Sequence, residues 1–318
     1  MRPLSIEEAK RNRDEKIEKA QSLLADAVGD LQSGEDWKAM LAKLAHGGRF
    51  SIRRLSFRNQ LLVEMQAPGT TLVASYLAWQ RGGRQVRKGE KALVILAPVI
   101  VNKSKKPVDP DVEEEHGRMV LVGFRPLATF SGSQTDPLPG EPGRPLPEPH
   151  TITKNIDADE AFAGSVEILR DVALGLGPEV VTDVELRPRG RRDSGVTRGW
   201  FDRRTREIVV VTEETSRAQI FKTLVHEIAH AILHGAEDHH ARSAMEVEAE
   251  SVAFVVCKVL GVETGNYSFP YVASWAGDED AESMVLKSGQ KIVRATNVIL
   301  DALFSADDKL EDNLKGAA

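Results

Sequence analysis

Apolar positions in the first part of the chain repeat with the period of an α-helix. A helix is expected over residues 5–44, where apolar side chains recur three to four positions apart, at Leu23, Leu24, Val28 and Leu31. Ser5 followed by Glu8 is a capping-box pattern at its start, and turn residues at 33–37 divide it in two. A further helix is predicted over 50–65. This part of the chain is therefore expected to be mainly helical.

Two strands and a proline-rich segment follow. Apolar runs at 92–101 and 119–130 are typical of strands, and the polar residues between them predict a long-looped hairpin. Residues 131–150 hold six prolines, which exclude a helix or an inner strand. Such a stretch is typical of a semi-rigid, extended linker. The chain is therefore predicted to form two domains.

The second half of the chain mixes helices with short strands. A helix is expected over 158–174, followed by three short strands and three helices, at 180–186, 196–201, 208–211, 216–234, 245–260 and 282–303. The predicted class is α+β, with a helical N-terminal domain that adds a β-hairpin or small sheet, and an α+β second domain. Their predicted bounds are 1–130 and 151–306, with the linker at 131–150 and a charged tail at 307–318.

Composition narrows the class of protein. A hydrophobic fraction of 41% with 28% charged residues is typical of a soluble globular protein. The net charge of −6 excludes a chain that binds polyanions over its whole surface, but leaves room for a local basic face. The single cysteine, Cys257, excludes a disulfide framework and favours a reducing, cytoplasmic location. Neither a signal peptide nor a membrane span is expected.

The motif His226-Glu227-Ile228-Ala229-His230 lies within the helix expected over 216–234. Residues four apart share a helical face, so His226 and His230 can offer two imidazole nitrogens to one ion. Glu227 lies beside them, where a carboxylate can take a proton from a metal-activated water. Two unrelated histidines on a solvated face are the alternative, but the apolar residues around the motif favour a buried catalytic helix. The pattern predicts a zinc-dependent metallopeptidase site.

A tetrahedral catalytic zinc needs a third protein ligand and an open position. Glu246 and Glu250 on the next helix are four apart and share a face, whereas Glu248 lies on a different one. One of the two carboxylates is expected to bind zinc, and the other to hydrogen-bond a ligand histidine. The spacing alone leaves open which carboxylate does which.

Three other histidines are weaker candidates for the metal site. His234 continues the face of the two motif histidines, although a histidine also suits a helix C-terminus. His239 and His240 are expected in a loop, where surface histidines are common. All three rank below the glutamates.

The predicted chemistry is peptide hydrolysis. Glu227 is the expected general base, which accepts a proton from the zinc-activated water and returns it to the leaving amine. A donor for the developing oxyanion is also needed, and Tyr267 and Tyr271 are the candidates. Both tyrosines have the alternative role of core or surface aromatics.

A basic segment lies between residues 49 and 91. It holds nine Lys and Arg residues against two acids, a net charge of +7 in a chain whose total is −6. Such segregation favours a surface that faces a polyanion, and aromatic residues beside it suit the stacking of single-stranded bases. The alternative is a solvated basic face, or one that docks on the acidic second domain. The candidate nucleic-acid-binding residues are Arg53, Arg54, Arg58, Tyr76, Trp79, Arg84, Arg87, Lys88 and Lys91.

Two stretches of this half form a specific pattern. Phe57-Arg58-Asn59-Gln60-Leu61-Leu62 with Gln66-Ala67-Pro68 precedes Trp79 and Gly83-Arg84-Gln85-Val86-Arg87-Lys88-Gly89-Glu90-Lys91. Over about residues 15 to 130 the chain thereby resembles the N-terminal domain of the ArdC antirestriction proteins. The resemblance implies a domain that binds single-stranded DNA, joined to a C-terminal zincin-like metallopeptidase domain.

The second half carries a resemblance of its own. Lys222-Thr223-Leu224-Val225-His226-Glu227-Ile228-Ala229-His230, with Glu246-Val247-Glu248-Ala249-Glu250, resembles the ImmA/IrrE-type and ArdC-type zincins. In the ImmA/IrrE type, a glutamate that opens an E-x-E-A-x run completes the zinc site. That position maps onto Glu246 and leaves Glu250 as a supporting partner or an alternative ligand.

Together the resemblances imply an antirestriction protein of a mobile genetic element, which binds single-stranded DNA and carries a zinc metallopeptidase site. Two alternatives stay open. One is an antirestriction module that binds single-stranded DNA and holds a non-catalytic, structural zinc. The other is a regulatory protease of the ImmA kind that cleaves a DNA-bound repressor. The sequence does not identify the protein or peptide substrate.

Overall fold

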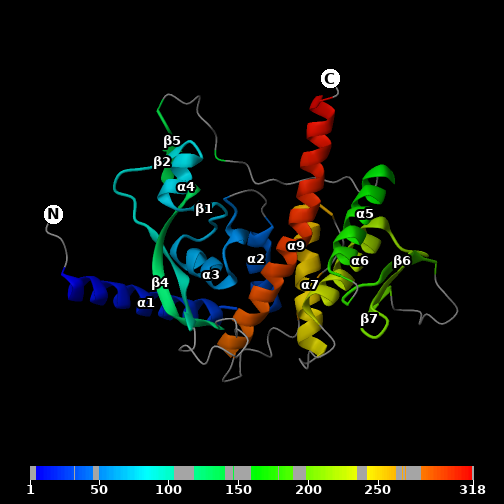
Figure 1. Cartoon of the computed structure of the whole chain (residues 1–318), viewed down its shortest axis with the longest axis horizontal. Coiled ribbons are helices and arrows are strands. Elements are labelled where there is room, and N and C mark those ends of the chain that lie inside the picture. The colour runs from blue at the N-terminus through cyan, green and yellow to red at the C-terminus, as the bar shows by residue number, and fades with distance from the viewer. Residues whose placement is uncertain are drawn as a thin grey trace, which may run out of the picture. The chain divides into compact units, whose positions relative to one another are not determined.

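The computed structural model describes residues 5–31, 33–45, 50–103, 118–139, 146, 159–177, 179–188, 198–234, 242–262, 267, 269 and 281–316. These residues form helices and small sheets, which confirms the α+β class (Figure 1). The chain divides into two compact units. The first comprises Met1–Ala27 and Asn59–Leu146, and the second comprises Val28–Arg58 and Pro147–Ala318.

Most of the first unit is built on a long hairpin. Strands β3 (Leu93–Lys103) and β4 (Arg118–Ser131) pair antiparallel, as predicted, with a shift of register between Val99 and Ile100. The short strand β1 (Val73–Ala74) pairs with the other side of β4, so β3 is an edge strand of this sheet. Helix α1 (Ile6–Gly29) begins with the expected capping box, in which Ser5 and Glu8 bond each other's backbone amides.

Side-chain amides of helix α3 (Phe57–Gln66) satisfy the free edge of β3. Asn59 both donates to the Leu96 carbonyl at 3.0 Å and accepts from the Leu96 amide at 2.9 Å. Gln66 repeats this arrangement at Val94, at 2.9 and 2.8 Å. A carboxamide carries one donor and one acceptor group, so it can replace the neighbouring strand that an edge residue lacks. Both residues therefore have a structural role in the ArdC-like pattern.

The second part of this unit includes the start of the expected linker. After helix α4 (Tyr76–Arg81), strand β2 (Arg84–Val86) pairs with β5 (Thr135–Pro137), and the short helix η2 (Gly132–Gln134) precedes β5. Residues 132–137 thus belong to the folded unit rather than to a linker that begins at residue 131. The proline of β5 is tolerated because a two-stranded sheet has only edge strands.

The second unit recruits a segment from the N-terminal half of the sequence. Helix α2 (Gly34–Leu44) and the short helix η1 (Ile52–Arg54) pack on α7 (Arg242–Val259) and α9 (Ala281–Gly316) respectively. The Trp37 indole donates to Ser251 Oγ at 2.9 Å, and both Trp37 and Phe57 are fully buried. Residues 28–58 therefore belong to the second unit, although the sequence predicted that residues 1–130 form the first domain. The reason is that their apolar side chains complete the core of the second unit.

The second unit also holds a three-stranded sheet with the order β6-β8-β7. Strand β6 (Asp183–Arg187) lies parallel to β8 (Glu207–Val211), and β7 (Gly199–Asp202) lies antiparallel to it at the edge. Helices α5 (Asp159–Gly175) and α6 (Arg217–Leu233) pack against each other.

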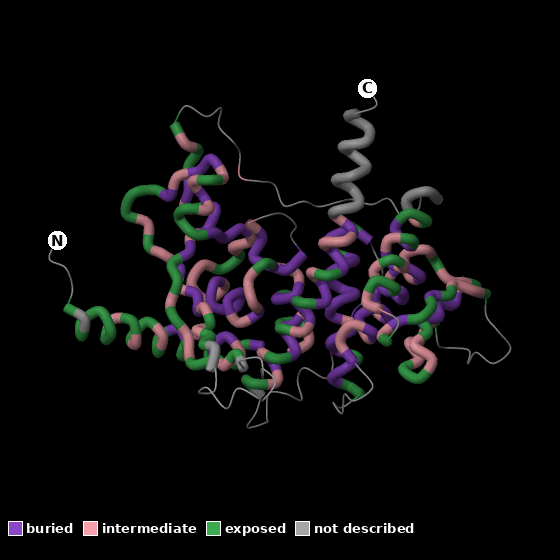
Figure 2. Tube along the Cα trace, viewed as in Figure 1, coloured by how far each residue is buried: buried purple, intermediate pink, exposed green. Residues whose placement is uncertain are grey.

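Burial differs sharply between the helices. Figure 2 shows buried positions along most of α7, whereas α1 is largely exposed. The helical backbone of α9 continues to Gly316, beyond the residue 303 at which the sequence predicted its end. No helix in the described part of the chain has both the length and the apolar character that crossing a membrane requires.

Candidate metal centre

Helix α6 presents the His-Glu-x-x-His motif to a cleft. Ser216 caps the helix by accepting from the Gln219 amide at 3.2 Å. The face of α6 away from the cleft is apolar and fully buried, with Phe221, Leu224, Val225, Ile228 and Ala229 each at 0% exposure. This packing fixes the rotation of the helix about its axis. His226 and His230, four residues apart, consequently point to the same side.

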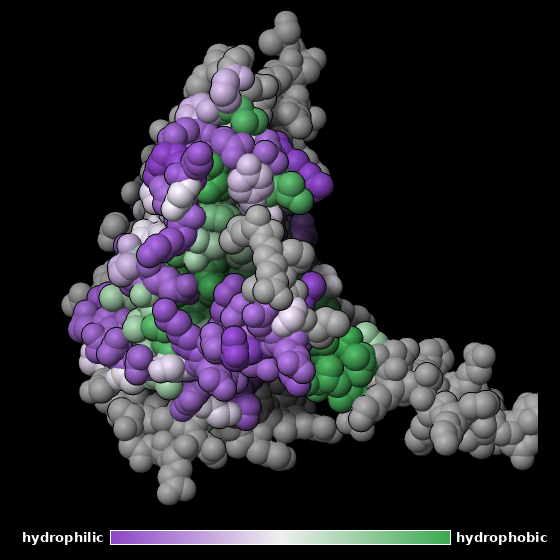
Figure 3. Space-filling view, turned by 90° about the vertical axis from the view of Figure 1, so that its left-hand side faces the viewer, coloured by the Kyte–Doolittle hydropathy of each residue, from purple (hydrophilic) through white to green (hydrophobic). Residues whose placement is uncertain are grey.

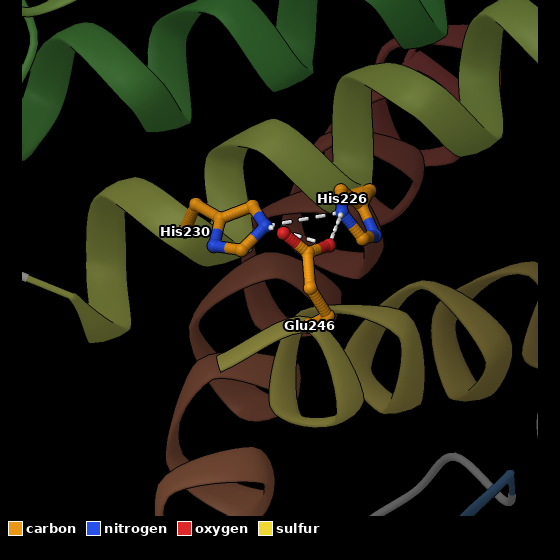
Figure 4. A group of neighbouring side chains, drawn as sticks. All are labelled: His226, His230 and Glu246. Atoms are coloured by element: carbon orange, nitrogen blue, oxygen red, sulfur yellow. Dashed lines mark hydrogen bonds and ion pairs between the residues drawn. The ribbon is translucent and has the colours of Figure 1, made fainter. Parts of the chain in front are cut away.

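Glu246 of α7 points toward both histidines and completes a triangle of donor atoms (Figure 4). The Nε2 atoms of His226 and His230 lie 3.1 Å apart, and Glu246 Oε2 lies 3.4 and 3.6 Å from them. Donors held at about 2.0–2.2 Å from one zinc ion with tetrahedral angles are separated by roughly 3.3–3.6 Å. The donor set and its spacing therefore fit a small divalent cation such as zinc.

Each histidine of the triangle has a further polar partner. His226 Nδ1 lies 3.3 Å from Glu250 Oε2, and Glu250 Oε1 accepts from the Lys222 ammonium at 2.7 Å. Glu250 thus contacts the far nitrogen of the His226 ring, while Glu246 contacts the near one. This is the arrangement of a residue that orients a ligand from behind. Glu246 and not Glu250 therefore faces the space between the histidines.

Behind His230 lies a buried network that the sequence did not predict. His230 Nδ1 lies 2.9 Å from His234 Nδ1, and His234 Nε2 lies 2.9 Å from Glu248 Oε2. Helix α9 completes it, since Ser288 donates to Glu248 at 2.7 Å and Lys291 lies 3.3 Å away. His234 and Glu248 are both at most 1% exposed. His234 is therefore not a third ligand in this geometry but a partner of the His230 ring.

Glu227 is held in the same cleft, next to strand β7. It is buried, and its Oε1 would lie 3.3 Å from a Cβ added to Gly199 of β7. Burial raises the pKa of Glu227 to about 7, and only the charge of His226 and a hydrogen bond from the Phe201 backbone oppose this rise. A carboxyl group with a pKa near neutrality can both accept and return a proton.

Electrostatics distinguish the two histidines before a metal binds. Burial lowers the pKa of His226, but hydrogen bonds to Glu246 and Glu250 outweigh it and raise that pKa to about 9. Burial lowers the pKa of His230. The hydrogen bonds from the two histidines lower the pKa of Glu246. In the metal-free protein His226 is therefore protonated at neutral pH, and its positive charge stabilises the carboxylates of Glu246 and Glu250.

The cleft around these residues has a volume of about 740 Å³. Strand β7 forms one wall with Gly199, Trp200 and Phe201, and helices α6 and α7 form the others. Its lining also includes cations from three parts of the second unit, namely Arg198, Arg203, Lys222 and Arg242. The site is thus an open, polar cleft with one sheet edge along it.

The predicted oxyanion donors are not supported in the described residues. Tyr267 is 8% exposed and does not line the cleft. Its ring instead lies under the Lys222 ammonium, 3.9 Å from the ring centre, and packs on Phe254. The prediction for Tyr267 is therefore wrong, because its aromatic ring is part of the core behind Lys222. Tyr271, together with His239 and His240, lies outside the described residues.

Three of the predicted nucleic-acid-binding residues are buried, so the prediction is wrong for them. Trp79 is 0% exposed and donates to the Phe130 carbonyl at 2.9 Å. Arg84 is 6% exposed and its guanidinium is bonded to Thr135. Arg53 is 1% exposed and donates to Asn297 and Asp301 of α9. A ring or guanidinium enclosed in this way cannot stack on a base or reach a phosphate.

The other candidates lie nearer to the surface. Arg54, in the second unit, forms an ion pair with Asp301 at 2.9 Å, and Arg58 is half-buried. In the first unit Tyr76, Lys88 and Lys91 are exposed. Arg87 is exposed too, but it forms ion pairs with Glu90 and Asp136. Figure 3 shows hydrophobic and hydrophilic side chains intermixed on one face of the molecule.

Two family profiles match the chain. Residues 22–130 match the N-terminal domain of the anti-restriction factor ArdC. Residues 189–257 match the IrrE N-terminal-like domain. The second segment contains the whole donor triangle together with Glu227. The first contains the hairpin of β3 and β4 and also the segment that packs into the second unit.

Individual proteins are similar over most of the chain. A Bacillus anthracis protein described as uncharacterized is 24% identical over 341 aligned positions, which cover 98% of this chain and 54% of that protein. The chain thus spans about half the length of this relative. Two crystal structures of the antirestriction protein ArdC from the R388 plasmid are also similar. The metal-free structure has a TM-score of 0.47 at 20% identity and covers 78% of this chain and 85% of its own. The Mn(II)-bound structure has a TM-score of 0.49 at 16% identity and covers 89% and 97%.

Proposed function

Because this chain is ArdC-like, with an N-terminal ArdC domain and a C-terminal IrrE-like domain of a peptidase family, we propose that its second unit is a zinc-dependent metallopeptidase. One observation carries the proposal. The near nitrogens of His226 and His230 and one oxygen of Glu246 form a triangle with sides of 3.1 to 3.6 Å. Two imidazoles, one carboxylate and an open cleft are the donor set of a catalytic rather than a structural zinc.

The protein's own groups then divide the reaction between them. A zinc ion bound at the triangle would supply Lewis-acid activation of water and of the substrate carbonyl. Glu227 accepts the proton of the attacking water and delivers it to the leaving amine. Glu250 holds the ring of His226, and His234 with Glu248 holds the ring of His230. The fixed rings keep the donor atoms in place during turnover.

The substitution Glu227→Gln tests this role. It keeps the shape of the side chain and removes its ability to take a proton, so the variant should bind zinc as the parent does and hydrolyse peptides at least about a hundredfold more slowly. The variant should also lose protection of unmodified plasmid DNA that enters a restricting bacterial host. Full protection by Glu227→Gln would favour the interpretation in which the zinc is structural. Cleavage of a DNA-bound repressor without any effect on restriction would favour the ImmA-like interpretation.

We also propose that the first unit binds single-stranded DNA. The support is the match to the ArdC N-terminal domain and the exposed cations Lys88 and Lys91, with Tyr76 exposed in the same unit. In the full chain, Lys88→Gln with Lys91→Gln should weaken binding of a single-stranded oligonucleotide and reduce the salt slope by about 0.7 for each phosphate that is no longer neutralised. Lys16→Gln with Lys19→Gln on α1 removes the same charge from two exposed positions and is the control. Equal effects of the two pairs would show that only net charge matters.

A further inference from the structure

The cations of the cleft are not all neutralised by its acids. Lys222 is paired with Glu250. Arg198, in contrast, donates to the Thr215 hydroxyl at 2.8 Å, and Arg203 contacts the Met245 sulfur at 2.9 Å. Within the described part of the chain, neither guanidinium has a carboxylate within ion-pair distance. Two arginines therefore face the cleft with their charge unbalanced.

A third arginine adds to this charge from the opposite wall. The Arg242 side chain is 94% exposed, and its Nε lies 3.9 Å from Glu246 Oε1. Glu246 also contacts His226 and His230, so its single negative charge is not available to Arg242 alone. With a divalent ion in place, the cleft would be strongly positive in a chain whose net charge is −6.

The unbalanced arginines bracket an edge strand. Arg198 directly precedes β7 and Arg203 directly follows it. Strand β7 pairs with β8 on one side, and no described strand pairs with its other side. The reactive carboxyl of Glu227 meets this strand between the two arginines, beside Gly199 and at the Phe201 amide. An extended peptide placed along β7 would have its middle at the reaction centre and a guanidinium near each end.

We propose that the cleft takes an extended, acidic polypeptide, with a Glu or Asp received by Arg198 on one side of the scissile bond and another received by Arg203 on the other. The proposal rests on the peptidase function proposed above and names its substrate class. At about 3.3 Å per residue, the two acidic residues would be roughly four to five positions apart. A carboxylate matches the planar fork of a guanidinium, and such charge-assisted pairs are stronger than neutral hydrogen bonds. Arg242 contributes long-range attraction from α7.

Binding to the zinc-loaded Glu227→Gln full chain tests the preference without cleavage. The probes are two fluorescein-labelled ten-residue peptides that differ only in two Glu residues, five positions apart, which are Gln in the second peptide. Fluorescence anisotropy should show at least about tenfold tighter binding of the Glu peptide. Adding Arg198→Gln or Arg203→Gln should each remove most of that preference. Arg204→Gln, at an exposed neighbour that does not line the cleft, is the matched control and should leave it unchanged.

Three outcomes would overturn the proposal. They are equal binding of both peptides, a preference that survives both arginine substitutions, and a single-stranded oligonucleotide that binds through Arg198 and Arg203 while neither peptide does. The last result would assign these arginines to nucleic acid. The two proposals fail in different ways. Cleavage of the Glu and Gln peptides at equal rates by the parent chain would leave the peptidase standing without the acidic specificity. Preferential binding of the Glu peptide with no cleavage of either peptide would support the acidic specificity and contradict the peptidase function.

Discussion

Truncation of Trp37 should loosen the metal-binding unit, although this residue lies more than 180 positions before the His-Glu-x-x-His motif in the sequence. The indole is fully buried, contacts the Phe57 ring at 5.8 Å between centres, and donates to Ser251 Oγ at 2.9 Å. Removing a buried Trp side chain costs about 3–5 kcal/mol, and the hydroxyl of Ser251 left without its donor adds about 1 kcal/mol. At about 1.4 kcal/mol for each factor of ten, the opening equilibrium of this unit should rise at least a hundredfold.

Hydrogen exchange read by mass spectrometry is the suitable assay, because a two-unit chain need not melt in one step. In Trp37→Ala, peptides from α6 and α7 should exchange faster while those from β3 and β4 keep their protection. Trp79→Ala is the matched control. Trp79 is also fully buried and makes one indole hydrogen bond, but it belongs to the first unit. Its loss should affect β3 and β4 instead. Unchanged exchange of α6 and α7 in Trp37→Ala would refute the assignment of residues 28–58 to the second unit.

Three further predictions concern the metal centre. Only a neutral imidazole binds a metal, so the pKa of about 9 for His226 predicts that zinc affinity rises with pH between about 6 and 9. Calorimetry in two buffers should show about one proton released per zinc ion at neutral pH. An affinity that does not change with pH would contradict this prediction. Glu248→Gln should weaken zinc binding about tenfold, because the His230 ring loses part of its support. Competition with a chelator measures this affinity. An unchanged affinity would show that the buried network does not position His230. Gly199→Ala places a Cβ 2.5 Å from Thr223 Cγ2, 3.1 Å from the Val209 carbonyl oxygen and 3.3 Å from Glu227 Oε1. The side chains of Thr223 and Glu227 must shift to admit it, so peptide hydrolysis should slow about tenfold with zinc content intact. An unaffected rate would show that the close packing of β7 on α6 does not position Glu227.

Local rules were enough to predict that the two motif histidines point to the same side of their helix. The four-residue spacing of the two motif histidines fixes a shared helical face whatever surrounds it, and α6 places both Nε2 atoms together. The same rule put Glu246 and Glu250 on one face of α7. Their separate roles depend on how α7 crosses α6, which no spacing encodes. The resemblance to ImmA/IrrE-type zincins favoured Glu246, and the donor triangle has the same residue.

Features that depend on distant packing could not be predicted in this way. Glu248 lies on the face of α7 opposite the cleft, so its contact with His234 depends on where α6 ends. The cluster of positive charge around Arg53 and Arg84 indicated a binding surface, but both guanidinium groups are enclosed by partners 51 or more residues away. Composition records the charge of a segment and not which side chains remain at its surface. Trp79 shows the same limit, because an aromatic residue beside cations serves equally well as a core residue.

The metal content of the purified full chain tests the central claim most directly. Protein produced with zinc available should hold about one zinc ion per chain. X-ray absorption should find two imidazoles among the ligands. Glu227→Gln should retain the ion, whereas His230→Ala and Glu246→Ala should each bind it at least a hundredfold more weakly. A metal-free parent protein, or a His230→Ala variant that holds zinc as tightly as the parent, would contradict the assignment of this cleft as a zinc peptidase site.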